Sequence, residues 1–158
     1  MPPAPFVDVA KLDQSSVAYG VDEIRKTNLQ RHEMEQLSGV FFLDPEGGPL
    51  IAAYRDIRDD EWWVRGHIPG RPLFPGVLML EAAAQAASFL ITRTFNENRF
   101  LGFGGVEDVR FRDTIVPPAR LILVGKAEKL HRRQSIVAVQ GFVDAKMVFE
   151  ARILGMYV

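Results

Sequence analysis

The sequence contains no cysteine among its 158 residues. A disulfide framework, a zinc site with thiolate ligands and catalysis by a cysteine nucleophile are therefore excluded. An excess of one charge is also absent, because 19 basic and 20 acidic residues leave a formal net charge of −1. Without a basic field to attract phosphate groups, we expect no nucleic-acid partner.

Long hydrophobic runs are missing as well. The most apolar stretch, residues 77–91, is interrupted by Glu81 and Gln85 and is shorter than the roughly 20 residues that a membrane span needs. The first residues, MPPAPFVDVAK, lack the basic and then apolar pattern of a signal peptide. We therefore expect a cytoplasmic protein with no membrane partner.

The composition favours one folded domain with a substantial core, since 47% of the residues are hydrophobic and 25% are charged. Residues 1–20 are weakly patterned and are expected to form an irregular N-terminal segment before a single domain, 21–158. A short helix is predicted within 21–30. Short strands are predicted at 39–44, 50–58 and 61–66, and longer ones at 100–113, 121–130, 134–143 and 146–158.

A long helix is predicted from Gly76 to about Thr94, because alanine, leucine and methionine dominate this stretch. The stretch is apolar on every face, which indicates burial on most sides. Strands at roughly ten-residue spacing favour an antiparallel sheet. The expected architecture is α+β, one long buried helix wrapped by an antiparallel sheet, whose open edge strands favour a dimer.

Two ionisable residues flank the start of this helix. Glu81 lies among alanines and leucines, where burial raises the pKa of a carboxyl group and suits it to act as a general acid. His67 lies in the glycine- and proline-rich loop GHIPGRPLFPG (66–76), and histidine is the commonest general base. Either residue alone is more simply a surface side chain, and their combination indicates a site.

Two further residues support such a site. Gly76 begins the predicted helix, so its N–H is free to stabilise negative charge on a carbonyl oxygen, although a turn glycine is the plainer interpretation. Gln85 follows Glu81 by four residues on the same helix face. It either orients the carboxyl group or is a second polar residue of a solvated stripe.

The segment GHIPGRPLFPGVLMLEAAAQAA (66–87) closely resembles the motif of the FabZ-type 3-hydroxyacyl-acyl-carrier-protein dehydratases, with Ile68 in place of the usual phenylalanine. The segment GGVEDVRFRDTIVPPARL (104–121) resembles a second motif of that family. The similarity covers most of residues 60–157. Before residue 60 it weakens, because NLQRHEMEQLSGVFFLD (28–44) lacks the leucine-proline-histidine-arginine segment typical of the family.

The resemblance implies a hot-dog fold and a homodimer, or a higher oligomer of dimers, with active sites at the subunit interface. It implies that His67 and Glu81, from opposite subunits, are catalytic. It implies that the Gly76 amide binds the thioester carbonyl and that Gln85 is the supporting glutamine. Glutamate at position 81 is typical of the FabZ type, since the isomerising FabA type has aspartate. No metal and no organic cofactor are expected.

The substrate is expected to be linked to acyl carrier protein or to coenzyme A. Apolar residues near the helix are candidates for an acyl tunnel, with a plain core role as the alternative: Leu73, Phe74, Leu78 and Phe89. Arginines are candidates for docking an acidic carrier protein. Two of them, Arg132 and Arg133, lie in a predicted turn, and the others are Arg110, Arg112 and Arg120.

Three functions are compatible with these residues. The dehydratase is favoured, a hot-dog thioesterase that activates water with a carboxylate is the nearest enzymatic alternative, and a non-catalytic acyl-binding protein is the third. A metal site around His32 in RHEMEQ (31–36) is a weaker possibility, because one histidine and two flexible carboxylates are few ligands.

Overall fold

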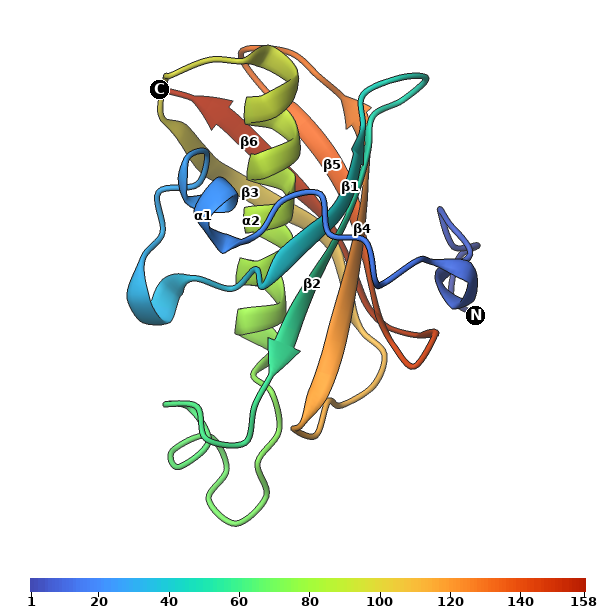
Figure 1. The fold of residues 1–158 in the computed structure, drawn as a ribbon, viewed down its shortest axis with the longest axis vertical. Helices are drawn as coiled ribbons and strands as arrows, with labels where there is room; N and C mark the ends of the chain where they lie inside the picture. Colours follow the sequence, from blue (N-terminus) through green and yellow to red (C-terminus); the bar gives the residue numbers. More distant parts are fainter.

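One long helix packs against one face of a six-stranded antiparallel sheet in the computed structural model, which describes residues 1–158 (Figure 1). The helix is α2, Gly76–Phe95. The strand order across the sheet is β1-β2-β4-β5-β6-β3. The strands are β1 (Gly39–Asp44), β2 (Leu50–Ile57), β3 (Leu101–Phe111), β4 (Ala119–Lys129), β5 (Ser135–Val143) and β6 (Lys146–Tyr157). The expected α+β architecture is confirmed.

Alternation along the strands divides the core between the two faces of the sheet, because successive side chains of a strand point to opposite sides. On β2, Ile51 and Ala53 belong to the main core with α2, whereas Ala52 belongs to a second cluster on the other face. On β4, Leu123 and Val124 divide in the same way. Both faces of the central strands are therefore covered.

The N-terminal residues 6–12 cover the outer face of the sheet, on the side opposite α2, and the chain then crosses β1 to the α2 side, where Tyr19 packs on the main core (Figure 1). They contain a 3-10 helix, η1 (Val9–Lys11), and Tyr19 forms an isolated bridge with Val40. Val9 is buried against the second cluster. The backbone N–H of Phe6 donates to the Gln140 side chain at 3.0 Å, which anchors the segment on β5.

The helix α2 begins and ends as its sequence predicts. Pro75 precedes it, and Asn96 ends it in the left-handed region at φ 52°, donating its N–H to the carbonyl of Thr92 at 2.8 Å. Four of its five alanines, Ala82, Ala83, Ala86 and Ala87, are fully buried. None of the helices combines the length and the hydropathy that a membrane crossing requires.

The strand predicted at 61–66 is wrong, because these residues form successive turns. Aromatic and β-branched residues make EWWVRG resemble a strand, but the carboxylate of Glu61 accepts a hydrogen bond from the amide of Arg58 at 2.7 Å. The Val64 amide donates to the Glu61 carbonyl, and the His67 amide donates to the Trp63 carbonyl at 2.8 Å. Tertiary contacts thus override the local preference.

The short helix predicted within 21–30 is confirmed only as α1, Val21–Arg25. The chain then leaves helical geometry, and Asn28 donates from its side chain to the Gln85 carbonyl of α2 at 3.0 Å. A second 3-10 helix, η2 (His32–Met34), follows. The segment 28–36 therefore lies along α2, where it contacts the polar residues of that helix.

Candidate functional site

His67 lies in the loop between β2 and α2, at the end of the sheet where α2 begins (Figure 1). The chain reverses sharply beside it, with Ile68 at φ 57° and Gly70 at φ 82°. The Nδ1 atom of His67 lies 2.8 Å from the carbonyl oxygen of Leu73. Because a carbonyl can only accept, Nδ1 carries the proton of this hydrogen bond, and Nε2 is the nitrogen that can present a lone pair as a base.

A cavity of about 440 Å³ opens beside His67. The aromatic and basic side chains that line the cavity come from the loop, and apolar side chains come from the first turn of α2. The lining residues are Trp62, Trp63, Arg65, Gly66, His67, Pro75, Val77 and Leu78. A mostly apolar hollow with one imidazole at its wall suits an apolar substrate that has a single reacting polar centre.

Gly76 is the first residue of α2, so its amide has no carbonyl one turn earlier within the helix. A Cβ at this position would lie 2.9 Å from the ring of Phe111, at the end of β3. A side chain at position 76 therefore requires the Phe111 ring to move. The neighbouring Pro75, Val77 and Leu78 all line the His67 cavity, which places the Gly76 backbone beside it.

Glu81 is half-buried on α2, and its carboxylate accepts a hydrogen bond from the Gln85 side chain at 2.8 Å. The same amide of Gln85 donates to the carbonyl of Met34 at 2.6 Å, and its oxygen accepts the N–H of Gln36 at 2.9 Å. Gln85 is 2% exposed. Its orientation is thus set by the segment before β1, which leaves its amide N–H directed at Glu81.

The sequence interpretation missed a buried arginine behind this cluster. Arg55 of β2 is 6% exposed and donates from Nε to the side-chain oxygen of Gln36 at 3.1 Å. Its other nitrogens form an ion pair with Glu61. A signal was available, because Arg55 follows Ile51 and Ala53 in the inward register of its strand, where a charge needs a buried partner.

The environment of Glu61 has opposing effects on its carboxyl group. Burial raises the pKa of Glu61, but the hydrogen bond from Arg55 and the one from the Arg58 amide outweigh it and leave this pKa below its ordinary value. Glu61 is therefore ionised in the folded protein at neutral pH, as the ion pair requires.

His67 and Glu81 are not brought together around one cavity within a single chain. Glu81 is absent from the lining of the His67 cavity. It belongs to a stripe of α2 that this chain leaves incompletely covered: Val77, Glu81, Ala84 and Ser88, of which Val77 is 71% exposed. The spacing of four, three and four residues places these side chains on one helix face.

The candidate tunnel residues take mostly core positions. Phe74, just before α2, is buried edge-to-face against Trp63. Phe89, in the C-terminal half of α2, is fully buried against Tyr19. Leu78 lines the His67 cavity. Leu73 is half-buried and contributes its carbonyl to the His67 ring.

The candidate carrier-binding arginines fall into two groups at opposite ends of β4. Arg120, the second residue of this strand, pairs with Asp56 at 2.7 Å. Arg112 pairs with Glu150 at 2.7 Å near the end of β3, where Arg110 is exposed. Arg132 and the exposed Arg133 follow β4. A strand rises about 3.3 Å per residue, so positions 120 and 129, near the two ends of β4, lie roughly 30 Å apart. The five residues do not form one patch.

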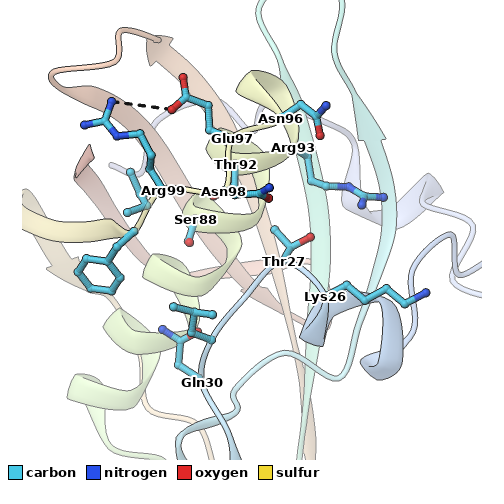
Figure 2. Close-up of a pocket in the computed structure, with 13 residues that line it drawn as sticks. Lys26, Thr27, Gln30, Ser88, Thr92, Arg93, Asn96, Glu97, Asn98 and Arg99 are labelled. Carbon is cyan, nitrogen blue, oxygen red and sulfur yellow. Dashed lines mark ion pairs between the residues drawn. The ribbon is translucent and has the colours of Figure 1, made fainter. Parts of the chain in front are cut away.

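A second hollow, of about 350 Å³, lies at the C-terminal end of α2 (Figure 2). Three cations line it, Lys26, Arg93 and Arg99, and Glu97 at its rim pairs with Arg132 at 2.8 Å. Figure 2 shows Lys26 and Arg93 extending to one side and Arg99 turned toward Glu97 on the other. The charges diverge, so the hollow is a cationic surface rather than a binding site for one small anion.

Comparison with known proteins places the chain in a family. The model of the FabA-like domain matches residues 28–152. The 3-hydroxyacyl-[acyl-carrier-protein] dehydratase FabZ of Lawsonia intracellularis is 36% identical over 110 residues, which cover 66% of this chain and 71% of that protein. FabZ of Escherichia coli O9:H4 is 34% identical over 115 residues, covering 71% and 76%.

Solved structures share the fold at low identity. The dehydratase heterocomplex ApeI:P from Xenorhabdus doucetiae matches with a TM-score of 0.71 at 11% identity, over 85% of this chain and 90% of that one. The putative thioesterase yhdA from Lactococcus lactis matches with a TM-score of 0.65 at 10% identity, over 78% and 92%. At such identity these two show the fold alone. On its family model and its curated relatives, the chain belongs to the FabA-like family of hot-dog proteins, with the FabZ-type dehydratases.

Proposed function

We propose that this chain removes water from a 3-hydroxyacyl thioester linked to acyl carrier protein, giving the trans-2-enoyl thioester in fatty acid or related acyl-chain biosynthesis. The observation that carries the proposal is the orientation of His67, whose Nδ1 is bound to the Leu73 carbonyl so that Nε2 is available as a base beside an apolar cavity. The reaction needs no redox change. We place it in the cytoplasm.

Each step can be assigned to a group of this chain. Nε2 of His67 takes the proton from the carbon next to the thioester carbonyl, and the Gly76 N–H stabilises the charge that develops on the carbonyl oxygen. Glu81, protonated, gives its proton to the 3-hydroxyl as the C–O bond breaks. The products are one water molecule and the C2=C3 double bond. Proton transfer from His67 back to Glu81 through solvent restores the site.

The active unit in this proposal is a homodimer in which His67 of one chain meets Glu81 of the other. Two features support it. The incompletely covered helix stripe bears Glu81, and the edge strand β3 exposes apolar side chains, Phe103 at 59% and Phe111 at 52%. Pairing of two β3 edges covers both features. A twofold axis makes such a pair antiparallel, so the start of one β3 lies beside the end of the other.

This pairing also selects a surface for the carrier. The hollow of Figure 2 includes Leu101, at the start of β3, whereas Phe111, at the end of β3, lies against Gly76. In the paired dimer the cationic end of one chain is therefore next to the His67 cavity of the other. We propose that an acidic carrier protein docks at Arg132 and Arg133 and the adjacent hollow, with its thioester arm directed into the partner's cavity.

The test is the reverse reaction, hydration of a trans-2-enoyl thioester, followed by loss of the enoyl absorbance. Wild type is measured beside His67→Ala and Glu81→Gln, with carrier-linked and coenzyme A substrates. We expect turnover by wild type and a loss of about 10²-fold or more in each variant. A folded, dimeric wild type that is inert on both substrates contradicts the proposal. Thiol release would then indicate a thioesterase, and tight binding without turnover an acyl-binding protein.

A further inference from the structure

Arg55 makes more contacts than a structural ion pair requires. From β2 its guanidinium donates to the Gln36 side chain at 3.1 Å, to the Asp56 carbonyl at 2.6 Å and to Glu61, with which it forms the buried ion pair. It also lies over the Phe74 ring, 5.4 Å from the centroid. These partners come from three separate stretches of the chain, which the planar, multiply donating guanidinium joins.

One branch of these contacts leads to Glu81. Gln36 is 1% exposed, and its side chain lies between Arg55 and the carbonyl of Glu33, to which it donates at 3.1 Å. Its backbone N–H donates to Gln85, and Gln85 donates to the Glu81 carboxylate. Two residues thus separate the Arg55 guanidinium from the candidate acid, and both are almost completely buried.

The other branch leads to the loop that bears His67. Glu61 lies near the start of this loop, residues 58–75, and Phe74 lies near its end. Arg55 contacts both, and the Phe74 amide is held in addition by the Ile115 carbonyl at 2.8 Å. The Leu73 carbonyl that orients His67 immediately precedes Phe74. A guanidinium fixed at both ends of a loop restricts the positions that the residues between them can take.

We propose that Arg55 is a positioning residue for the dehydration: it touches neither reacting group, but one guanidinium sets both the carboxyl group of Glu81 and the loop of His67. The proposal rests on the proposed function. It assigns a role in turnover to a side chain outside the motif of residues 66–87. Small displacements of a base or an acid from the reacting atoms reduce rates strongly, so an intact but loosened site still binds substrate and reacts slowly.

The decisive variant is Arg55→Lys, which keeps a positive charge for Glu61 but loses the fork that also reaches Gln36. Gln36→Leu is the second variant, because it removes the side-chain oxygen through which Arg55 contacts this branch. It keeps the backbone N–H that donates to Gln85 and the ion pair of Arg55 and Glu61. The double variant completes a cycle. Arg152→Lys is the control, since the partly exposed Arg152 of β6 also pairs with two carboxylates, Glu128 at 2.9 Å and Glu107 at 2.5 Å, and takes part in neither branch. All are assayed as full-length protein with a small enoyl thioester, well below the lowest Tm.

We expect Arg55→Lys to lower kcat by about tenfold or more with an unchanged KM, and Gln36→Leu to lower it by a smaller factor. The double variant should be no slower than Arg55→Lys, because the branch is already broken. Arg152→Lys should match wild type. If Arg55→Lys does not fold, Gln36→Leu alone has to show the loss in kcat.

Three results overturn the inference. The first is a wild-type kcat in Arg55→Lys or, where that variant does not fold, in Gln36→Leu. The second is a loss that disappears when rates are corrected for the folded fraction, which is what a purely structural role produces. The third is independent losses that multiply in the double variant. An inert wild type overturns the proposed function and this inference together, whereas an active wild type with an equally active Arg55→Lys overturns this inference alone.

Discussion

The ring of His67 is held by the backbone of Leu73, six residues later, through a contact of 2.8 Å from Nδ1 to the carbonyl oxygen. An asparagine at position 67 can place its amide nitrogen near Nδ1 but has no group at the position of Nε2. We therefore expect His67→Asn to keep the wild-type Tm within a few degrees and to lose about 10²- to 10⁴-fold in kcat. Differential scanning calorimetry measures the Tm, and the hydration assay measures kcat. A variant that unfolds early, or one that stays active, contradicts this assignment of the two ring nitrogens.

Mixing two inactive variants tests whether the site is shared. In a dimer of one His67→Ala chain and one Glu81→Gln chain, a site formed between chains leaves one centre with both native groups. After denaturation and joint refolding, random pairing should restore about a quarter of wild-type activity. The separately refolded variants are the control. If both groups act within one chain, every centre lacks one of them, and the mixture stays as inactive as its parts.

Gly76→Ala separates packing from substrate access. The added methyl group would lie 2.9 Å from the Phe111 ring, so we expect a Tm lower by a few degrees together with a kcat lower by about 10²-fold. Removing the ring in Gly76→Ala/Phe111→Ala, with Phe111→Ala as its reference, relieves the clash. The Tm penalty should then vanish while the loss in kcat persists, since the methyl group still blocks the backbone amide. If both the Tm and kcat recover in the double variant, the methyl group at position 76 acts only through packing against Phe111.

The ion pair of Arg55 and Glu61 predicts a dependence of stability on pH. Because the pKa of Glu61 is lower in the folded protein, its contribution is complete above the unfolded pKa, about 4.3, and is lost as the pH falls through the folded value. Glu61→Gln should lower the free energy of unfolding by about 3 kcal/mol at pH 7. Urea unfolding from pH 7 to 3 should show this difference shrinking below pH 4. A difference that is constant over this range contradicts the assigned shift.

Charge reversal distinguishes the two ends of β4 as carrier-binding surfaces. We expect Arg133→Glu to raise KM for a carrier-linked substrate several-fold and to leave KM for a small thioester unchanged, because only the carrier presents an acidic surface. Arg110→Glu, an exposed arginine at the other end, is the matched comparison and should have the smaller effect. A larger effect of Arg110→Glu would indicate that the carrier docks at the other end of β4. Equal effects of Arg133→Glu on both substrates would show that Arg133 does not contact the carrier.

The elements that sequence predicts well are those with a local cause. The bounds of α2 follow from Pro75 before it and from its unbroken helix formers, and β1 follows from the apolar run at 39–44. Residues 61–66 have an equally strong local preference for strand, yet Glu61 is drawn into a turn by the Arg58 amide and by Arg55. The one site contact that spacing predicts, between Glu81 and Gln85, is likewise local, because the two residues are four apart on one helix.

The contacts behind the site were not predictable from spacing. Gln36 meets Gln85 across 49 residues of sequence and Arg55 across 19, and no periodic pattern links such positions. The split of the arginines has the same origin, because residues 120 and 132 are close in sequence but are separated by the length of an extended strand. Such relationships depend on how the strands are ordered in the sheet.

The Arg55 contacts have a genetic consequence if each reaction centre takes its base from one chain and its acid from the other. All the bonds from Arg55 to Gln85 and to the His67 loop lie within one chain. A dimer of one wild-type and one Arg55-variant chain would then have a loosened acid in one centre and a loosened base in the other. A substitution at Arg55 would thus behave as dominant in a cell that makes both forms, whereas substitutions at His67 or Glu81 would leave one centre of each mixed dimer intact.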